Sequence, residues 1–295
     1  MINALCIDFE PWYTPELLRK YIPEAKCWDK EDQAVEAVLP ILDLLDKYNT
    51  KATFAVLGIV AEAHPEIVKS IFEKGHEIAS HAYSHRMLNE LGREKFEDEI
   101  KMSTKLLESI TGQKPIGFRA PSFSINNSTK WAFEVLTKYG FKYDASICPV
   151  NARLYGVPKA PLHPYRPSLN DVSQEDISGS IIEFPMTAIK LGVNIPISGG
   201  FYFRTLPLWF LKLAIRKVNQ TRPALIYIHP WETYPKTPRL KNLPLASRFI
   251  TYYGIGSALK KFEALLKEFQ FQPLREALAS DYQLKYHNAN MMAIK

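Results

Sequence analysis

The sequence predicts an α/β protein in which parallel strands close into a (β/α) barrel, and three observations point to this class. Segments with the pattern of buried strands alternate with amphipathic helices along most of the chain, an order that is typical of parallel sheets. The length of 295 residues suits a barrel of this kind. Several predicted strands end in a charged or histidine side chain, and such barrels carry their active sites at the strand ends.

The first half of the chain holds short apolar strands with helices between them. The predicted strands cover residues 3–9, 52–57, 77–80, 117–119 and 142–145. The predicted helices place apolar residues at helical spacing and cover residues 32–48, 61–74, 93–111 and 128–139. We expect Gly112 to end the third of these helices, because glycine readily adopts the left-handed conformation that closes many helices.

The second half starts with an irregular segment. Residues 148–176 are rich in proline and lack periodicity, so we predict a long loop that forms one wall of a cleft. Strands are then expected at 181–186 and 224–229, with a helix at 206–219 between them and a last helix at 257–269. The chain shows no internal repeat.

Composition and charge narrow the class of function. The net charge is +6, and the basic residues are spread along the chain without a lysine- or arginine-rich block, so we expect no nucleic acid partner. Cys6, Cys27 and Cys148 are too scattered for a disulfide framework, and the N-terminus lacks a signal-peptide pattern, so the expected location is the cytoplasm. The apolar residues 201–215 are too few to span a membrane. They favour a helix packed on the core, and peripheral membrane contact stays open as the alternative.

Two pairs of side chains have the spacing of metal ligands. Asp8 and Glu10 are two residues apart, so a strand places both carboxylates on one face, where they suit metal binding or acid–base catalysis. The alternative is a solvated strand end. His81 and His85 are four residues apart just after a predicted strand, and two such imidazoles can reach one ion. Together these residues offer three ligands to a catalytic metal with an open position.

Three further polar residues stand at predicted strand ends. Arg119 follows a short strand, and its fixed guanidinium fork can orient a carboxylate. Asp144 and His229 end two later strands. Polar groups at the ends of five separate strands are hard to explain by structure alone, and we therefore predict one active site at that edge of the sheet.

The segments that carry these residues resemble a known family. CIDFE, SHAYSH, FRAPSFS, YDAS and IYIHPWE, in this order, are similar to the five motifs of the polysaccharide deacetylases (carbohydrate esterase family 4, NodB type) over residues 1–235. FRAPSFSI, SGGFYFR and IHPWE further resemble the branch found in bacterial exopolysaccharide loci, which implies a C-terminal extension, residues 236–295, packed on the barrel. The family implies a distorted (β/α) barrel and metal-dependent removal of N-acetyl groups from sugars.

The resemblance implies a role for each matching residue. Glu10, His81 and His85 match the metal ligands. Asp8 matches the general base, and Arg119 matches the arginine that positions this base.

Other matches concern the leaving group and the substrate. His229 matches the general acid, and Asp144 matches the carboxylate that tunes it. The amide of Ser122 falls where the family supplies an oxyanion donor. Tyr227 falls in the position that lines the acyl pocket, and Trp231 is assigned to the substrate site.

The expected cofactor is a divalent metal, zinc first, although two imidazoles and a carboxylate also suit Co²⁺, Ni²⁺ or Fe²⁺. The expected partner is an N-acetylated glycan or a lipid-linked sugar. Two alternatives stay open: hydrolysis of another C–N bond, as in an amino-sugar deformylase or an allantoinase-like enzyme, and a pseudoenzyme that only binds glycans. The presence of both Asp8 and His229 favours an enzyme.

Overall fold

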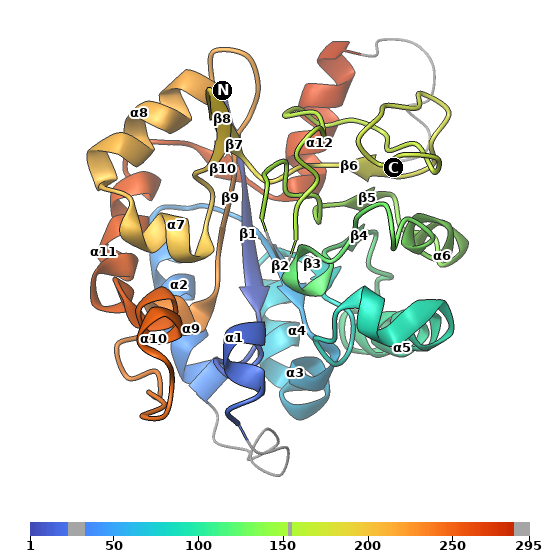
Figure 1. Cartoon of the computed structure of the whole chain (residues 1–295). Helices are drawn as coiled ribbons and strands as arrows, with labels where there is room; N and C mark the ends of the chain where they lie inside the picture. The colour runs from blue at the N-terminus through green and yellow to red at the C-terminus, as the bar shows by residue number, and fades with distance from the viewer. Residues whose placement is uncertain (23–32, 153–154, 286–295) are drawn as a thin grey trace.

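The computed structural model describes residues 1–22, 33–152 and 155–285, which form a curled parallel sheet surrounded by helices (Figure 1). Among these residues, the sheet comprises β1 (Asn3–Phe9), β2 (Thr53–Val56), β3 (Glu77–Ser80), β4 (Gly117–Phe118), β5 (Tyr143–Asp144), β6 (Ile182–Glu183), β9 (Leu225–Ile228) and β10 (Phe271–Gln272). The order is β10-β1-β2-β3-β4-β5-β6, with β9 also paired to β1, and these pairings are parallel. The predicted α/β barrel is confirmed, in an incomplete and distorted form.

Loop segments bridge the gap between β6 and β9. The Thr187 hydroxyl donates to the Leu225 carbonyl (3.0 Å) and accepts from the Leu225 amide (2.6 Å). The Tyr227 amide donates to the Ser198 carbonyl at 2.9 Å. Between these contacts lies an antiparallel hairpin, β7 (Ala188–Leu191) and β8 (Val193–Pro196). The hairpin was not expected, because most of its side chains are at least partly exposed and the segment lacks a buried-strand pattern.

Helices cover the outside of the sheet, and those predicted from the sequence occur among them in the predicted order, together with further helices that were not expected. They are α1 (Glu16–Arg19), α2 (Gln33–Lys47), α3 (Gly58–Ala63), α4 (Pro65–Glu73), α5 (Leu88–Thr111), α6 (Ala132–Lys138), α7 (Gly200–Thr205), α8 (Leu208–Val218), α9 (Pro230–Thr233), α10 (Leu245–Tyr252), α11 (Ile255–Leu266) and α12 (Leu274–Lys285). The helix predicted at 61–74 is in fact two, because Pro65 has no amide hydrogen to continue α3 and instead starts α4. Gly112 ends α5 with a φ of 72°, as predicted. Residue 32, the predicted start of α2, lies outside the described residues.

The C-terminal part of the chain shares the core of the barrel. Phe262 and Leu265 of α11 belong to the same apolar cluster as Ile7 of β1 and Phe54 of β2. The short strand β10, which was not expected, pairs with the start of β1. Helix α11 thus packs on the barrel core, and β10 is part of the sheet itself.

The helix expected at 206–219 is α8, and it packs on the core as predicted. Leu211 and Ile215 are buried in the main apolar cluster. Trp209 and Leu213 face outward and are 64% and 53% exposed. In the part of the chain that the structure describes, no helix combines the length and apolar character needed to cross a bilayer.

The proline-rich segment 148–176 is a loop in its described part, with isolated bridges only. Tyr155 of this loop lines the cavity described below, in agreement with the predicted cleft wall. Cys148 at its start and Cys6 of β1 are buried free thiols. Cys27 lies outside the described residues.

Candidate active site

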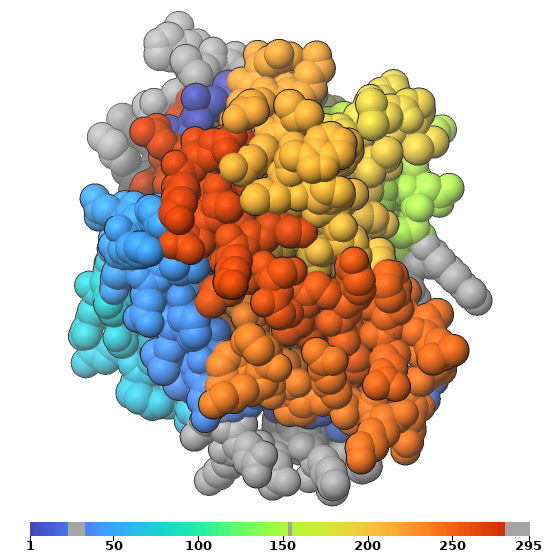
Figure 2. Space-filling model, turned by 90° about the vertical axis from the view of Figure 1, so that its left-hand side faces the viewer, coloured from blue at the N-terminus to red at the C-terminus, as the bar shows by residue number. Residues whose placement is uncertain are grey.

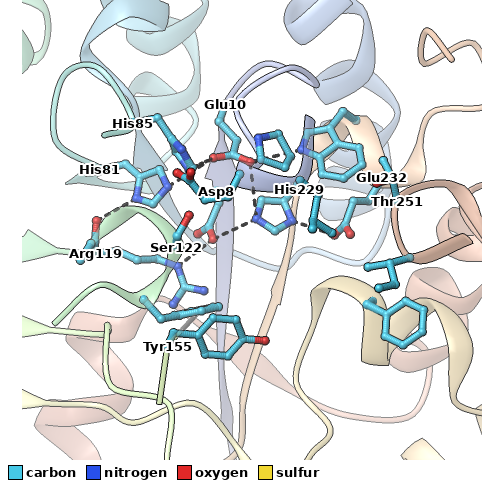
Figure 3. A pocket seen from close by; sticks show the side chains of 18 of the residues that line it. Asp8, Glu10, His81, His85, Arg119, Ser122, Tyr155, His229, Glu232 and Thr251 are labelled. Carbon is cyan, nitrogen blue, oxygen red and sulfur yellow. Dashed lines mark hydrogen bonds and ion pairs between the residues drawn. The ribbon is translucent and has the colours of Figure 1, made fainter. Parts of the chain in front are cut away.

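Polar side chains from several strand ends meet at one edge of the sheet (Figure 3). Asp8 stands near the end of β1 and Glu10 directly after it, while His81 follows β3, Arg119 follows β4 and His229 follows β9. All five line a cavity of about 200 Å³. They come together because the carboxyl ends of parallel strands share one edge of a sheet, where such folds bind ligands.

Eight of the ten side chains singled out from the sequence line this cavity: Asp8, Glu10, His81, His85, Arg119, Ser122, His229 and Trp231. Tyr227 and Asp144 do not. The ring of Tyr227 lies 4.4 Å from the Arg119 guanidinium carbon and contacts the rings of Phe123 and His229 edge-on. Tyr227 therefore packs on Arg119 and is not among the residues that line this cavity.

Glu10, His81 and His85 form a buried cluster with the donor set of a metal site. Their ligand atoms all lie within 4.8 Å of one another. Glu10 Oε2 is 2.6 Å from His85 Nε2 and 3.4 Å from His81 Nε2. Burial opposes ionisation of Glu10, but the neighbouring imidazoles of His85, His229 and His81 hold its pKa well below the ordinary value. The cluster is thus a charged carboxylate facing two imidazole nitrogens.

Backbone contacts fix the orientation of the first imidazole. His81 Nδ1 lies 2.7 Å from the Arg119 carbonyl oxygen, which can only accept, so Nδ1 carries the proton. The Nε2 lone pair of His81 is then directed at the cluster. Metal-binding histidines usually donate a hydrogen bond from the other ring nitrogen to a carbonyl or carboxylate oxygen, as His81 does here.

The loop that carries His85 packs closely against Gly58. The Gly58 amide donates to the Ala82 carbonyl at 3.0 Å, and a Cβ at Gly58 would lie 2.8 Å from the backbone Cα of Tyr83. The Glu99 carboxylate accepts the amides of Tyr83 (3.1 Å) and Ser84 (3.2 Å). Both contacts hold the turn that directs His85 toward Glu10.

Asp8 is held by Arg119 in a buried ion pair. Arg119 Nε donates to Asp8 Oδ2 at 2.7 Å, and Nη1 donates to the Ala145 carbonyl at 2.7 Å. His229 Nε2 lies 3.5 Å from the same Asp8 oxygen. One Asp8 oxygen therefore faces both the arginine that fixes it and the histidine across the cavity.

His229 has a carboxylate partner that the sequence analysis missed. Its Nδ1 lies 2.7 Å from Glu232 Oε2, and the other Glu232 oxygen lies 2.9 Å from Arg204 Nε. Burial lowers the pKa of His229, but the charges of Glu232, Glu10 and Asp8 raise it to about 9. The expectation that Asp144 holds this imidazole is therefore wrong. The missed signal is the spacing in HPWE, because three residues along the short helix α9 bring the two side chains to one face.

Asp144 has a different environment, behind the cavity. It is fully buried and accepts a hydrogen bond from the Ser146 hydroxyl, which in turn accepts the Ala120 amide at 2.7 Å. Burial raises the pKa of Asp144 to about 6, and burial together with the neighbouring Asp144 carboxylate raises the pKa of Glu183 well above its ordinary value. Asp144 therefore supports the loop after Arg119.

Two neighbours of His229 and Arg119 complete the walls. Trp231 stacks on His229 with ring centroids 5.6 Å apart, and its Nε1 donates to Glu10 Oε1 at 3.2 Å. Ser122 lines the cavity with a φ of 52°, a strained conformation for a residue with a side chain. Strain of this kind is concentrated at functional sites in proteins.

Comparison with known proteins gives two matches to family models. Residues 27–143 match the polysaccharide deacetylase family, a segment that includes His81, His85 and Arg119. Residues 145–279 match a domain of unknown function (DUF3473), a segment that includes His229 and Glu232. The boundary between the two matches falls directly after β5.

Curated relatives agree over part of the chain. A peptidoglycan deacetylase of Helicobacter pylori is 36% identical over 107 residues, which are 36% of this chain and 36% of that protein. A peptidoglycan-N-acetylglucosamine deacetylase of Bacillus cereus is 40% identical over 95 residues, which are 32% of this chain and 34% of that protein. The matched region thus spans about a third of the length of these relatives.

Solved structures agree over nearly the whole chain. A Mycobacterium smegmatis protein assigned to the polysaccharide deacetylases has a TM-score of 0.58 and 18% identity, with 98% of this chain and 94% of that chain covered. The Puue allantoinase has a TM-score of 0.61 and 14% identity, with 97% and 91% covered. At these low sequence identities, the similarity indicates a shared fold and nothing more specific.

Proposed function

We propose that this chain, whose residues 27–143 match the polysaccharide deacetylase family, is a metal-dependent hydrolase that removes N-acetyl groups from the amino sugars of a glycan. The observation that carries the proposal is the meeting of a base, an acid and a metal-type cluster in one cavity. Asp8 and His229 lie 3.5 Å apart, and the cluster of Glu10, His81 and His85 adjoins both.

The cluster fits a divalent metal. Two neutral imidazoles and an ionised carboxylate are a common zinc-binding set, and they leave a coordination position open. The 3.4 Å between Glu10 Oε2 and His81 Nε2 is near the separation of two ligands at about 2.1 Å from one tetrahedral ion. His85 Nδ1 is buried without a hydrogen-bond partner among the described residues, and His85 Nε2 faces Glu10 Oε2 at 2.6 Å, a direct contact that a bound ion would replace. Zinc is our first choice, with Co²⁺, Ni²⁺ and Fe²⁺ compatible.

A divalent ion bound there supplies Lewis-acid polarisation of the acyl carbonyl. Asp8 takes a proton from the attacking water, and the Arg119 ion pair keeps its carboxylate oriented toward the cavity. His229 then gives a proton to the nitrogen of the leaving amine. Glu232 keeps this imidazole protonated at neutral pH, because it raises the pKa toward 9. The Ser122 amide is our candidate donor to the developing oxyanion.

The walls of the cavity suit a sugar. Tyr155, Phe201 and Trp231 line it, and aromatic faces stack well on pyranose rings. Its volume of about 200 Å³ is below that of a typical site for a drug-sized ligand, which favours one sugar residue at a time. The relatives named above act on peptidoglycan, and the motif resemblance extends the candidates to exopolysaccharides and lipid-linked sugars.

One experiment tests the proposal. Metal-reconstituted protein is incubated in parallel with chito-oligosaccharides, peptidoglycan fragments, an N-acetylated lipid-linked sugar and allantoin, and acetate, formate and ureide hydrolysis are assayed. We expect acetate release that Asp8→Asn abolishes. Formate release or ureide hydrolysis alone would establish another C–N hydrolase, and binding without any release would establish a pseudoenzyme.

A further inference from the structure

The acidic residues of this chain are distributed very unevenly. Residues 184–262 contain 12 lysines and arginines but a single acidic residue, Glu232. That carboxylate is buried between Arg204 and His229 and does not offset the surface charge. The rest of the chain contains 25 basic and 30 acidic residues. A protein with a modest overall charge of +6 therefore has one strongly basic segment.

The same segment exposes large apolar side chains on α10 and just after it. Leu245 is 83% exposed, Phe249 and Tyr253 are each 51% exposed, and Ile250 is 36% exposed. Two exposed basic residues, Lys241 and Arg248, stand among them and pair with no carboxylate in the described part of the chain.

Helix α8 adds to this surface. Its exposed Trp209 and Leu213 accompany the basic residue Lys217 and Arg216, whose guanidinium pairs with Glu268 beyond the basic segment. Figure 2 shows α8 in light orange and α10 in darker orange on the same face of the molecule, with α11 in red-orange beside them. We call the exposed apolar side chains of α8 and α10 the apolar face: Trp209, Leu213, Leu245, Phe249, Ile250 and Tyr253.

We propose that the apolar face and its basic surroundings dock on an anionic lipid membrane. Interfacial helices combine Trp, Phe and Leu with Lys and Arg, and aromatic rings prefer the headgroup level of a bilayer. The positive charge attracts anionic lipids, and the apolar side chains enter the boundary between headgroups and acyl chains. A soluble polyanion would match the charge alone, and a second copy of this chain would bring the same positive charge. The membrane is the partner that matches both properties.

The apolar face reaches the mouth of the catalytic cavity. Ile250 belongs to the face and also lines the cavity, and Phe201 of the cavity wall contacts the ring of Phe249. The Ile250 carbonyl accepts a hydrogen bond from Arg204 at 2.8 Å, so the docking helix also supports the partner of Glu232. Docking in this way places the cavity mouth beside the lipid headgroups.

Vesicle co-sedimentation tests the docking without turnover, so its outcome is independent of the proposed hydrolysis. The full chain is mixed with phosphatidylcholine vesicles with or without phosphatidylglycerol, at low and high salt. We expect binding to the anionic vesicles that weakens with salt. Lys241→Glu and Arg248→Glu should each weaken binding at least about fivefold, since a basic residue near the surface contributes about 1 kcal/mol. Trp209→Ser with Leu245→Ser should weaken it by about tenfold.

Matched variants on other faces provide the control. Lys105→Glu on α5 and Ile177→Ser, a side chain that is 75% exposed, should leave vesicle binding unchanged. Equal loss in these controls, or no preference of the wild type for anionic vesicles, would overturn the proposal. Binding of dextran sulfate without vesicle binding would indicate a soluble polyanion as partner. A dimer in sedimentation velocity that Leu245→Ser dissociates would assign the face to a second copy. Thermal unfolding of each variant confirms that the fold is retained.

Discussion

Replacing Glu232 with glutamine tests how His229, the proposed general acid, is kept protonated. The pKa of His229 is about 9 against an ordinary 6.5, although burial alone would lower it, and Glu232 is the largest of the charges that raise it. The rise corresponds to roughly 3 kcal/mol in favour of the imidazolium. Without the carboxylate, burial opposes only the weaker effects of Glu10 and Asp8. We therefore expect the pKa to fall by about two pH units in Glu232→Gln.

The assay is the pH dependence of kcat/KM, whose basic limb reports the acid of the free enzyme. A general acid works only while protonated, so activity falls as pH rises through its pKa. The wild type should keep its activity to near pH 9, and Glu232→Gln should lose it from near neutral pH. Since glutamine leaves Arg204 partly unpaired, Glu232→Gln with Arg204→Gln should give the same limb, with thermal unfolding measured for both variants.

Asp144→Asn is the matched comparison, because the sequence assigned the same role to Asp144. Its carboxylate contacts Ser146 and Glu183, not the imidazole. Asp144→Asn should lower kcat at all pH values, because the hydrogen bonds through Ser146 would hold the Ala120 amide less firmly. It should leave the basic limb of the kcat/KM profile in place. A limb that moves in Asp144→Asn but not in Glu232→Gln would refute this assignment.

Three further predictions concern the base, the metal cluster and the fold. Asp8→Asn should keep bound metal but lower kcat at least about a hundredfold, because the amide cannot accept the proton; near-normal turnover would place the base elsewhere. Elemental analysis should find about one divalent ion per wild-type chain and little in His81→Ala, and equal metal in both would contradict the ligand set. Gly58→Ala should lower the free energy of unfolding in urea by roughly 1–3 kcal/mol, because the added methyl would lie 2.3 Å from the Tyr83 ring. Gly256→Ala, with no atom within 4 Å and a helical position, should not destabilise, and equal effects of the two substitutions would contradict the steric argument.

Much of this site can be predicted from the sequence, because the end of a buried strand can be recognised from the local pattern of residues. Asp8, His81 and Arg119 stand directly at the ends of apolar segments, and a parallel sheet brings such ends together whatever the rest of the chain does. The hairpin β7–β8 and the strand β10 could not be predicted in this way. Their segments are short or partly exposed, so they lack the hydrophobic pattern on which such a prediction depends.

Glu232, and not Asp144, is the carboxylate partner of His229 because of where the two side chains lie. Arg119 donates to the Ala145 carbonyl directly after β5, and its guanidinium carbon lies 4.4 Å from the ring of Tyr227, which in turn contacts the ring of His229. Glu232 lies three residues after His229 on a single turn of helix, so the acid and its partner move as one element. Asp144 is then available to hold Ser146 and the loop at Ala120. Arg204 joins Glu232 to the Ile250 carbonyl of α10, whereas Arg119 joins Asp8 to the Ala145 carbonyl after β5, so different elements hold the carboxylate partner of His229 and the carboxylate of Asp8.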